Sequence, residues 1–253
     1  MAAIRAIDVS EWQGLIDWQK VKADGVEVAI IRYADGLYMD RYFHQNMTNA
    51  KKAGLHVGSY IFSRAVNAAQ AKEEAQRIIN ACKPYKLDMP IYIDLEAENL
   101  KYFANTTARA FIDECTKNKV MGGIYANLNW FNNYIDPQRF RDCALWLAQW
   151  NSAITARDPS LFGLWQYSDK GKINGITGNV DLNLCFVEYW KTGTNQENKE
   201  AKQDEKIKTI CNELYTKTKQ TIAGKYSNGM ERQKALGDYY TPVQWIINRV
   251  LKE

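Results

Sequence analysis

Two acidic residues, Asp94 and Glu96, end a run of strand-forming residues, Ile91-Tyr-Ile-Asp-Leu-Glu96. Alternate side chains of a β-strand point to the same face, so the two carboxyl groups are expected side by side. Neighbouring carboxyl groups repel each other when both are ionised, which raises the pKa of one of them. A protonated and an ionised carboxyl group together can supply an acid and a base at neutral pH. These two residues are therefore the first candidates for a catalytic pair.

Other residue types that carry chemistry are scarce. The chain of 253 residues has two histidines, and its five cysteines are widely spaced. We therefore expect no metal site, no disulfide framework and no cofactor. The net charge of +4 is too small to indicate nucleic acid as a partner. Acid–base chemistry must then depend on carboxylates and tyrosines.

Eight short apolar segments occur within the first 190 residues. Helical segments follow the first five, whereas loops with Gly, Asn, Asp and Pro follow the last three. Alternating strands and helices are typical of parallel α/β units. We therefore expect an α/β barrel whose last units have lost most of their helices. The expected strands are Ile4–Asp8, Val26–Arg32, His56–Phe62, Met89–Glu96, Val120–Tyr125, Ala144–Ala148, Leu164–Tyr167 and Val180–Leu184.

Active residues of such barrels lie at the carboxyl ends of the strands. Asp8 and Asp181, from the first and last strands, are therefore expected to join Asp94 and Glu96 in one site. Aromatic rings and one amide at other strand ends are expected to form the substrate-binding walls. These candidates are Tyr33, Tyr60, Tyr125, Trp150, Gln166 and Tyr167.

The character of the sequence changes after Trp190. Residues 191–199 are polar, as expected of a linker. Three segments with helical spacing of apolar residues follow within residues 200–253. We expect a barrel domain over residues 1–190 and then a small all-α three-helix bundle. Because such a bundle is near the lower size limit for independent folding, a helical extension packed on the barrel is the alternative.

The N-terminus has no basic region followed by an apolar stretch, and no run of about 18 apolar residues occurs. We therefore expect neither a signal peptide nor a membrane-spanning helix, and no membrane partner. The chain is expected to be made in the cytoplasm.

Seven motifs follow one another along the chain: Asp8-Val-Ser10, Gly58-Ser-Tyr-Ile-Phe62, Ile93-Asp-Leu-Glu96, Gly123-Ile-Tyr125, Leu145-Trp-Leu-Ala148, Leu164-Trp-Gln-Tyr167 and Gly178-Asn-Val-Asp181. In this order and spacing they resemble glycoside hydrolase family 25, the Chalaropsis-type lysozymes common among phage endolysins. The resemblance covers about residues 4–190 and implies an irregular (β/α)5(β)3 barrel. It also implies hydrolysis of the β-1,4 bond between N-acetylmuramic acid and N-acetylglucosamine in peptidoglycan, once another protein has breached the membrane.

The resemblance makes Glu96 the general acid and Asp94 the residue that stabilises the transition state. Asp94 would act as a nucleophile or orient the substrate's own N-acetyl group. Asp8 and Asp181 would flank the pair and tune Glu96, and the aromatic walls would stack on sugar rings. Close carboxyl groups favour retention of configuration. The chain departs from the family at Asp35-Gly36, where members often carry Glu-Gly.

The tail resembles the cell-wall-binding repeat of the CW-seven type, a three-helix bundle that recognises muropeptide. The segments concerned are Ile222-Ala-Gly-Lys-Tyr-Ser-Asn-Gly-Met-Glu-Arg232, Leu236-Gly-Asp-Tyr-Tyr240 and the stretch from Val243 to Val250. The resemblance makes Arg232 the main ligand contact, with Asn228 and Tyr239 beside it. A guanidinium fork suits carboxylate or carbonyl groups of a stem peptide. One copy of the repeat binds weakly, so avidity requires self-association through this region.

Two other interpretations remain open. In the first, Asp8, Asp94, Glu96 and Asp181 hold Mg²⁺ or Ca²⁺ in a metal-dependent barrel hydrolase. In the second, the protein binds peptidoglycan in the same groove without cleaving it. Activity that is insensitive to chelators contradicts the first interpretation, and any glycan hydrolysis contradicts the second.

Overall fold

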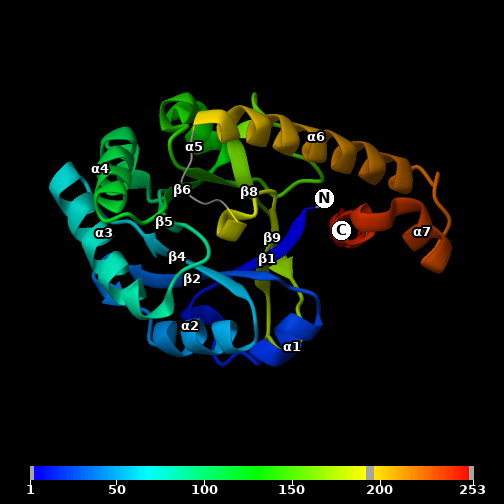
Figure 1. Cartoon of the computed structure of the whole chain (residues 1–253), viewed down its shortest axis with the longest axis horizontal. Coiled ribbons are helices and arrows are strands. Elements are labelled where there is room, and N and C mark those ends of the chain that lie inside the picture. Colours follow the sequence, from blue (N-terminus) through cyan, green and yellow to red (C-terminus); the bar gives the residue numbers. More distant parts are fainter. Residues whose placement is uncertain (1–2, 192–196, 251–253) are drawn as a thin grey trace.

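The computed structural model describes residues 3–191 and 197–250. Eight strands close into a barrel at its centre (Figure 1). Their order around the barrel is β1, β9, β8, β7, β6, β5, β4 and β2, and β2 pairs with β1 to close the ring. The strands are β1 (Ile4–Val9), β2 (Val28–Asp35), β4 (His56–Phe62), β5 (Ile91–Asp94), β6 (Gly122–Asn127), β7 (Ala144–Ala148), β8 (Phe162–Gly171) and β9 (Val180–Cys185).

Strand β9 runs opposite to the rest of the barrel. It is antiparallel to both β8 and β1, whereas the other neighbours pair in parallel. The first residues of β9 therefore lie at the end of the barrel where the other strands finish. This direction places Asp181 directly opposite Asp8 in the register of β1 and β9. A two-residue strand, β3 (Tyr38–Met39), pairs with the end of β2 at the same rim.

Five α-helices connect the first strands of the barrel. They are α1 (Trp18–Ala23), α2 (Phe43–Lys52), α3 (Ala68–Cys82), α4 (Ala104–Lys117) and α5 (Leu128–Asn133). The β7–β8 connection contains only the 3₁₀ turn η5 (Pro159–Leu161), and β8 and β9 form a hairpin. Other 3₁₀ turns are η1 (Glu11–Gln13), η2 (Lys83–Tyr85), η3 (Glu98–Leu100), η4 (Pro137–Phe140) and η6 (Tyr189–Lys191).

Helix α3 illustrates how the local sequence builds this layer. The side chain of Asn67 accepts a hydrogen bond from the Gln70 backbone N–H at 3.0 Å and so caps the first turn. The residues that face inward recur at helical spacing and are buried: Ala71, Ala75, Ile78, Ile79 and Cys82. The helix therefore presents one apolar stripe, as a barrel-covering helix must.

The predicted eight-stranded α/β barrel is confirmed, with shifts at the strand ends. The second strand extends to Asp35 instead of Arg32. Strand β5 ends at Asp94, so Glu96 lies two residues beyond it. A hydrogen bond of 3.0 Å from Leu95 N–H to the Tyr125 carbonyl continues the ladder past the assigned strand. Glu96 therefore stays close to Asp94 at the barrel mouth.

Three further α-helices follow the barrel: α6 (Glu197–Ile222), α7 (Gly229–Leu236) and α8 (Tyr240–Val250), with the turn η7 (Gly237–Tyr239) between the last two. Helix α6 begins three residues before the predicted start at residue 200. Residues 192–196, most of the predicted linker, lie outside the described residues. No helix within the described ranges has the length and apolar character needed to cross a membrane.

These C-terminal helices pack against one side of the barrel (Figure 1). Their buried side chains belong to the same continuous apolar core as the barrel strands. The Arg5 guanidinium of β1 lies 3.3 Å from the ring centre of Trp245 in α8, and Tyr167 of β8 lies 6.3 Å from that ring. The core residues supplied by the helices are Ile207, Ile210, Leu214, Leu236, Val243, Ile246 and Ile247.

Candidate active site

A pocket of about 210 Å³ lies at the barrel end where the parallel strands finish. All four predicted carboxylate residues line it, together with side chains from β2, β4, β6, β7 and β8. The lining residues are Asp8, Val9, Ser10, Trp12, Gln13, Arg32, Tyr60, Phe62, Asp94, Glu96, Tyr125, Trp146, Gln166 and Asp181.

Asp8 and Asp181 form a coupled pair on one wall. Burial is the main cause that raises the pKa of both groups, and the negative charge of Asp8 raises the pKa of Asp181 further, to about 9. Hydrogen bonds from Gln166 and Asn183 favour the ionised form of Asp8. Asp181 therefore keeps the shared proton at neutral pH and donates it toward Asp8.

Two amide side chains fix the orientation of Asp8. Its Oδ2 accepts hydrogen bonds from Asn183 Nδ2 at 2.7 Å and from Gln166 Nε2 at 3.0 Å. The Asn183 oxygen accepts from the indole N–H of Trp146 at 2.8 Å, so its nitrogen must face Asp8. The Gln166 oxygen likewise accepts from Tyr125 Oη at 3.1 Å and from Trp150 Nε1 at 3.0 Å. These two amide donors fix the position of Asp8 Oδ2 in the pocket.

Asp94 is the most enclosed acid of the pocket, with only 3% of its surface exposed. Burial raises its pKa well above the usual value, and the charges of Glu96 and Asp8 raise it further, whereas the nearby Arg32 lowers it. Its Oδ1 atom is buried and has no hydrogen-bond partner among the described residues. A buried acceptor without a donor is costly, so this atom is suited to a donor on a ligand.

Glu96 lies at the mouth of the pocket with its side chain exposed. The protein around it and the negative charge of Asp8 raise its pKa. Glu96 therefore combines a raised pKa with direct access to solvent protons. Asp94 has the raised pKa without that access.

Aromatic rings form the remaining walls. Tyr60 and Tyr125 line the pocket as predicted. Both pack edge-on against Trp146, with ring centres 6.0 Å and 4.5 Å away. Trp150 lies beside the pocket, 54% exposed, and is anchored through its hydrogen bond to Gln166. An exposed ring with a fixed edge can present a flat face to a sugar.

Besides Trp150, which lies next to the lining residues, two predicted substrate-binding residues do not line the pocket. Tyr33 is buried in the barrel wall, where its ring packs edge-on against Phe43 of α2 at 5.3 Å. Tyr167 is buried on the outer face of β8, between Trp165 and the ring of Trp245. The preceding residue lines the pocket in each strand: Arg32 in β2, which was not predicted as a site residue, and Gln166 in β8, which was.

Three residues near the carboxylates were not predicted as site residues. Their positions depend on the alternation of side chains between the two faces of a strand. Asn183 lies two residues after Asp181 on the inward face of β9, and Trp146 is in the middle of β7. Arg32 precedes Tyr33, and a register shift between Arg32 and Ala34 leaves Tyr33 as an extra residue. Strict alternation from Asp181 would have identified Asn183, whereas the shift in β2 has no clear signal in the sequence.

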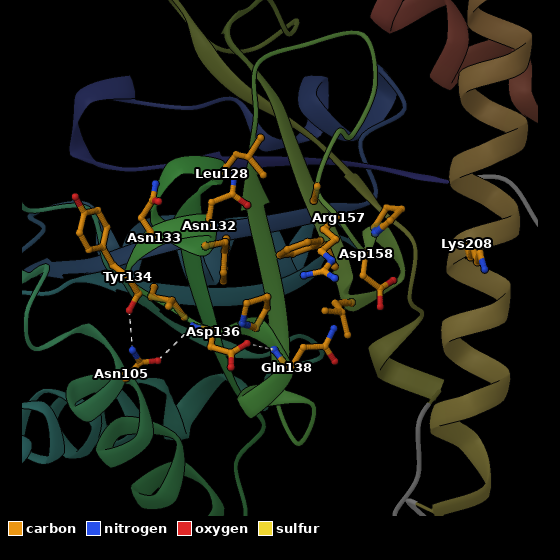
Figure 2. Close-up of a pocket in the computed structure, with 17 residues that line it drawn as sticks. Asn105, Leu128, Asn132, Asn133, Tyr134, Asp136, Gln138, Arg157, Asp158 and Lys208 are labelled. Carbon is orange, nitrogen blue, oxygen red and sulfur yellow. Dashed lines mark hydrogen bonds between the residues drawn. The ribbon is translucent and has the colours of Figure 1, made fainter.

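A larger hollow, of about 910 Å³, lies elsewhere, between α5, the β7–β8 connection and Lys208 of α6 (Figure 2). Its acids cap short helical turns. Asp136 Oδ1 accepts from the Gln138 backbone N–H at 3.0 Å, and Asp158 Oδ1 accepts from the Ser160 hydroxyl at 2.6 Å. These carboxylates stabilise backbone turns and do not form an acid–base pair. Chemistry therefore assigns the active site to the smaller pocket.

The three predicted wall-binding residues lie in the C-terminal helices. Arg232 donates hydrogen bonds to the Ser227 carbonyl at 2.7 Å, to Asn228 Oδ1 at 2.6 Å and to Gln244 Oε1 at 3.2 Å. Tyr239 is half-buried, with the Lys217 ammonium 5.2 Å from its ring centre. Arg232 and Asn228 thus contact each other, and the guanidinium also holds the turn before α7 in place.

The fold and the pocket together define a barrel hydrolase that works with carboxyl groups. The sequence profile of the glycosyl hydrolases family 25 matches residues 7–176, about two thirds of the chain. The chain belongs to this family.

Known proteins agree with this membership. The chain is similar to an autolytic lysozyme of Clostridium acetobutylicum, at 28% identity over 93% of this chain and 72% of that protein. It is also similar to lysozyme M1 of Streptomyces globisporus, at 32% identity over 72% of this chain and 67% of that protein.

Among solved structures, the CTP1L endolysin matches 74% of this chain and 68% of its own length, with a TM-score of 0.66 and 25% identity. The autolysin LytC of Streptococcus pneumoniae has the same fold, with a TM-score of 0.65 at 24% identity. The chain spans only 46% of the length of LytC.

Proposed function

We propose that this protein is an N-acetylmuramidase, a lysozyme that cleaves the β-1,4 bond between N-acetylmuramic acid and N-acetylglucosamine in peptidoglycan. The observation that carries the proposal is the cluster of Asp8, Asp94, Glu96 and Asp181 in one aromatic-walled pocket of a family 25 barrel. Glycoside hydrolysis needs one protonated carboxyl group at the leaving oxygen and negative charge near the sugar that becomes positive. This pocket contains both.

Glu96 is the general acid in this proposal, because an acid that turns over must recover its proton from solvent. Glu96 is at the mouth and exposed, whereas Asp94 is enclosed. A substrate N–H that donates to Asp94 Oδ1 favours the ionised form of Asp94. Binding of an acetamido group at this atom would therefore leave the proton of the pair on Glu96, where the reaction needs it.

In the reaction, Glu96 gives its proton to the glycosidic oxygen as the bond from that oxygen to C1 breaks. The leaving sugar keeps the electron pair of this bond. The positive charge on C1 and the ring oxygen is stabilised by ionised Asp94, which acts as a nucleophile or holds the acetamido group whose carbonyl oxygen attacks C1. Water then attacks C1 as the bond from C1 to the Asp94 carboxylate or the acetamido oxygen breaks, and that oxygen keeps the electron pair. The water gives one proton to the Glu96 carboxylate, which restores the acid. Both routes retain the configuration at C1.

Mass analysis of digested peptidoglycan tests the activity directly. Fragments that end in reducing N-acetylmuramic acid support the proposal. Reducing N-acetylglucosamine or released peptides contradict it. Full activity after dialysis against a chelator would contradict the metal-dependent alternative, and wall binding without fragment release would favour the non-catalytic one.

The amide donors to Asp8 give a prediction about pH. Replacing Asn183 with Ala removes the 2.7 Å hydrogen bond that favours ionised Asp8, so the pKa of Asp8 rises further. The negative charge of ionised Asp8 stabilises the protonated form of Glu96 and the positive charge on the sugar. Activity therefore falls at the pH where Asp8 becomes protonated. The acid limb of the pH–rate profile is expected to move upward by about one pH unit, as expected for a lost bond to a charged group.

Asn129 offers a matched control, because it is an exposed amide that bonds only to Asn133 among the described residues. Asn129→Ala should leave the acid limb in place. If Asn183→Ala keeps both its thermal stability and the acid limb of its pH–rate profile, the Asn183 amide does not set the pKa of Asp8.

We also propose the family's (β/α)5(β)3 barrel over residues 1–190, a linker at 191–199 and a CW-seven wall-binding repeat over 200–253. The match to the autolytic lysozyme supports a related tail, because 93% of the chain exceeds the share taken by the barrel. In this proposal a second copy of the chain supplies avidity through the C-terminal region.

Replacing Arg232 with Ala should reduce co-sedimentation with purified cell walls about tenfold, because a guanidinium fork to a carboxylate is lost. Hydrolysis of soluble glycan fragments should not change. Since Arg232 also bonds to Ser227 and Gln244, Gln244→Ala serves as the control for loosening of the bundle. Equal loss of wall binding in both variants would make Arg232 a structural residue.

The likeness to the CTP1L endolysin supports a further proposal, that this protein lyses a bacterial host from the cytoplasm after the membrane is breached. Expression in a susceptible bacterium should cause lysis only when the membrane is permeabilised. Lysis without permeabilisation would contradict this role and would leave the muramidase activity unaffected.

A further inference from the structure

A large aromatic side chain stands at the rim of the active-site pocket without cover. Trp12 of η1 is 77% exposed and also lines the pocket. An exposed indole of this size is unfavourable in water, and exposed aromatic surface beside a pocket marks a binding surface. An exposed aromatic ring can simply lie on a mobile loop tip, but several hydrogen bonds hold the turn that carries Trp12.

The turn itself is capped in both directions. The side chain of Ser10 accepts from the Trp12 backbone N–H at 3.3 Å, and the Ser10 backbone N–H donates to Gln13 Oε1 at 2.8 Å. The next residue, Gly14, has φ +63°, a conformation that glycine adopts without strain. Gln13 Nε2 also donates to the Asn179 carbonyl at 3.2 Å and ties the turn to the β8–β9 hairpin.

The neighbour of Trp12 is held even more strongly. The Glu11 backbone N–H donates to Asp40 Oδ2 at 2.8 Å, and Tyr38 Oη donates to Glu11 Oε2 at 3.1 Å. Arg41 Nε lies 3.4 Å from the same carboxylate. Arg32, which is buried, lies 3.9 Å from Glu11 Oε1 and bonds to Asp40 at 2.9 Å. The buried Arg32–Asp40 pair, with Asp40 bonded to the Glu11 backbone, fixes the position of this turn.

The turn that carries the exposed Trp12 ring is fixed at its backbone, so the ring is held at the rim of the pocket. The pocket of about 210 Å³ is smaller than typical ligand pockets of roughly 300–1,000 Å³, so a polymer must continue over the rim. A pyranose ring has an apolar C–H face that stacks on an indole, and a fixed backbone lowers the entropy lost when the indole binds it.

We propose that Trp12 is the platform for a sugar of the glycan strand next to the one held over Asp94 and Glu96, and that Glu11 positions it. Glu11 acts through Trp12 and touches no substrate. The inference rests on the proposed muramidase function and adds a binding position outside the pocket. Trp12 thereby selects an extended glycan strand over short fragments.

The test measures binding and turnover separately. Binding of soluble peptidoglycan strands, freed of peptides, is measured by calorimetry in the Glu96→Gln background, where no strand is cut. Trp12→Ala is expected to weaken binding about tenfold, and Trp12→Phe about threefold or less. In the active enzyme, Trp12→Ala should raise KM for long strands by a similar factor and leave kcat within about twofold.

A double-mutant cycle identifies the role of Glu11. Glu11→Gln keeps the size of the side chain and weakens the ion pairs to Arg32 and Arg41. It should raise KM about threefold in the wild-type chain and have no further effect when Trp12 is already Ala. Tyr215→Ala, which removes an exposed aromatic ring from α6, is the matched control and should change nothing.

Unchanged binding of long strands by Trp12→Ala overturns the inference. A drop in kcat equal to the rise in KM would show a structural role for Trp12, and it would overturn the inference as well. Additive effects of Glu11→Gln and Trp12→Ala would overturn the positioning role. A different result contradicts the muramidase proposal. In that case Trp12→Ala weakens the binding of glycan strands, but the wild-type chain does not cut them.

Discussion

Glu96→Gln is expected to lower the rate of glycan hydrolysis by about 10²–10⁴-fold, the usual loss when a general acid is removed. The amide has nearly the same shape as the acid but cannot donate a proton to the glycosidic oxygen. Because Glu96 is at the exposed mouth of the pocket and bears no hydrogen bond that stabilises the fold among the described residues, thermal stability should not fall. The rate is measured as turbidity loss of purified cell walls and as release of reducing ends.

The pH profile separates loss of the acid from general damage. Partial desolvation by the surrounding protein and the charge of Asp8 raise the pKa of Glu96. The wild-type enzyme is therefore active while Glu96 is protonated and loses activity as the pH rises through this raised pKa. The remaining activity of Glu96→Gln should lack this alkaline limb. If Glu96→Gln still loses activity as the pH rises, the alkaline limb belongs to another group, such as the Asp8–Asp181 pair.

Glu98 provides a matched control two residues further along. It is exposed, forms an ion pair with Lys101 and does not line the pocket. Glu98→Gln should keep full activity. If Glu96→Gln hydrolysed walls at an undiminished rate, the acid assignment would be wrong, and Asp94, with its strongly raised pKa, would become the candidate.

The barrel could be predicted from the sequence because each strand is a nearly continuous apolar run, which suits a strand buried on both faces. Asp8, Asp94 and Glu96 could be placed together because the carboxyl ends of parallel strands in a barrel converge on one rim. The direction of β9 could not be predicted. A strand after a long loop can pair either way, and only the closed barrel places Asp181 opposite Asp8.

The side-chain errors have a local physical cause. Gln166 and Tyr167 are adjacent and were both predicted, but only Gln166 is an inward residue of β8, where it donates a hydrogen bond to Asp8. Tyr33 was displaced by the register shift in β2, which brings Arg32 inward. In β2 the tyrosine was chosen over Arg32, and in β8 the tyrosine was added to the correct Gln166, because tyrosine is a common sugar contact. The exposed Trp12 gave no signal, because its importance depends on bonds from Glu11 and Gln13 that only the fold creates.

Trp245→Ala, in helix α8, is expected to destabilise the whole protein and not only its C-terminal helices. The ring of Trp245 covers the Arg5 guanidinium at 3.3 Å, and Arg5 is held by the Asp24 carbonyl at 2.6 Å. Burial at this junction lowers the pKa of Arg5 to about 10. A desolvated cation–π contact contributes about 2 kcal/mol. For a chain of this size the midpoint of thermal unfolding should fall by about 4–8 °C.

Calorimetry distinguishes an attached helical layer from an independent bundle. Because α6 and α8 share the apolar core of the barrel, the full chain should unfold in one cooperative transition, and Trp245→Ala should shift that single transition. Tyr215→Ala, at an exposed aromatic residue of α6, should leave the midpoint within about 1 °C, as expected of surface substitutions. Two separate transitions, of which Trp245→Ala moved only the smaller, would show that residues 200–253 fold independently of the barrel. A chain ending at Lys191 would then keep its hydrolysis of soluble fragments, whereas the shared core predicts that this activity is lost together with stability.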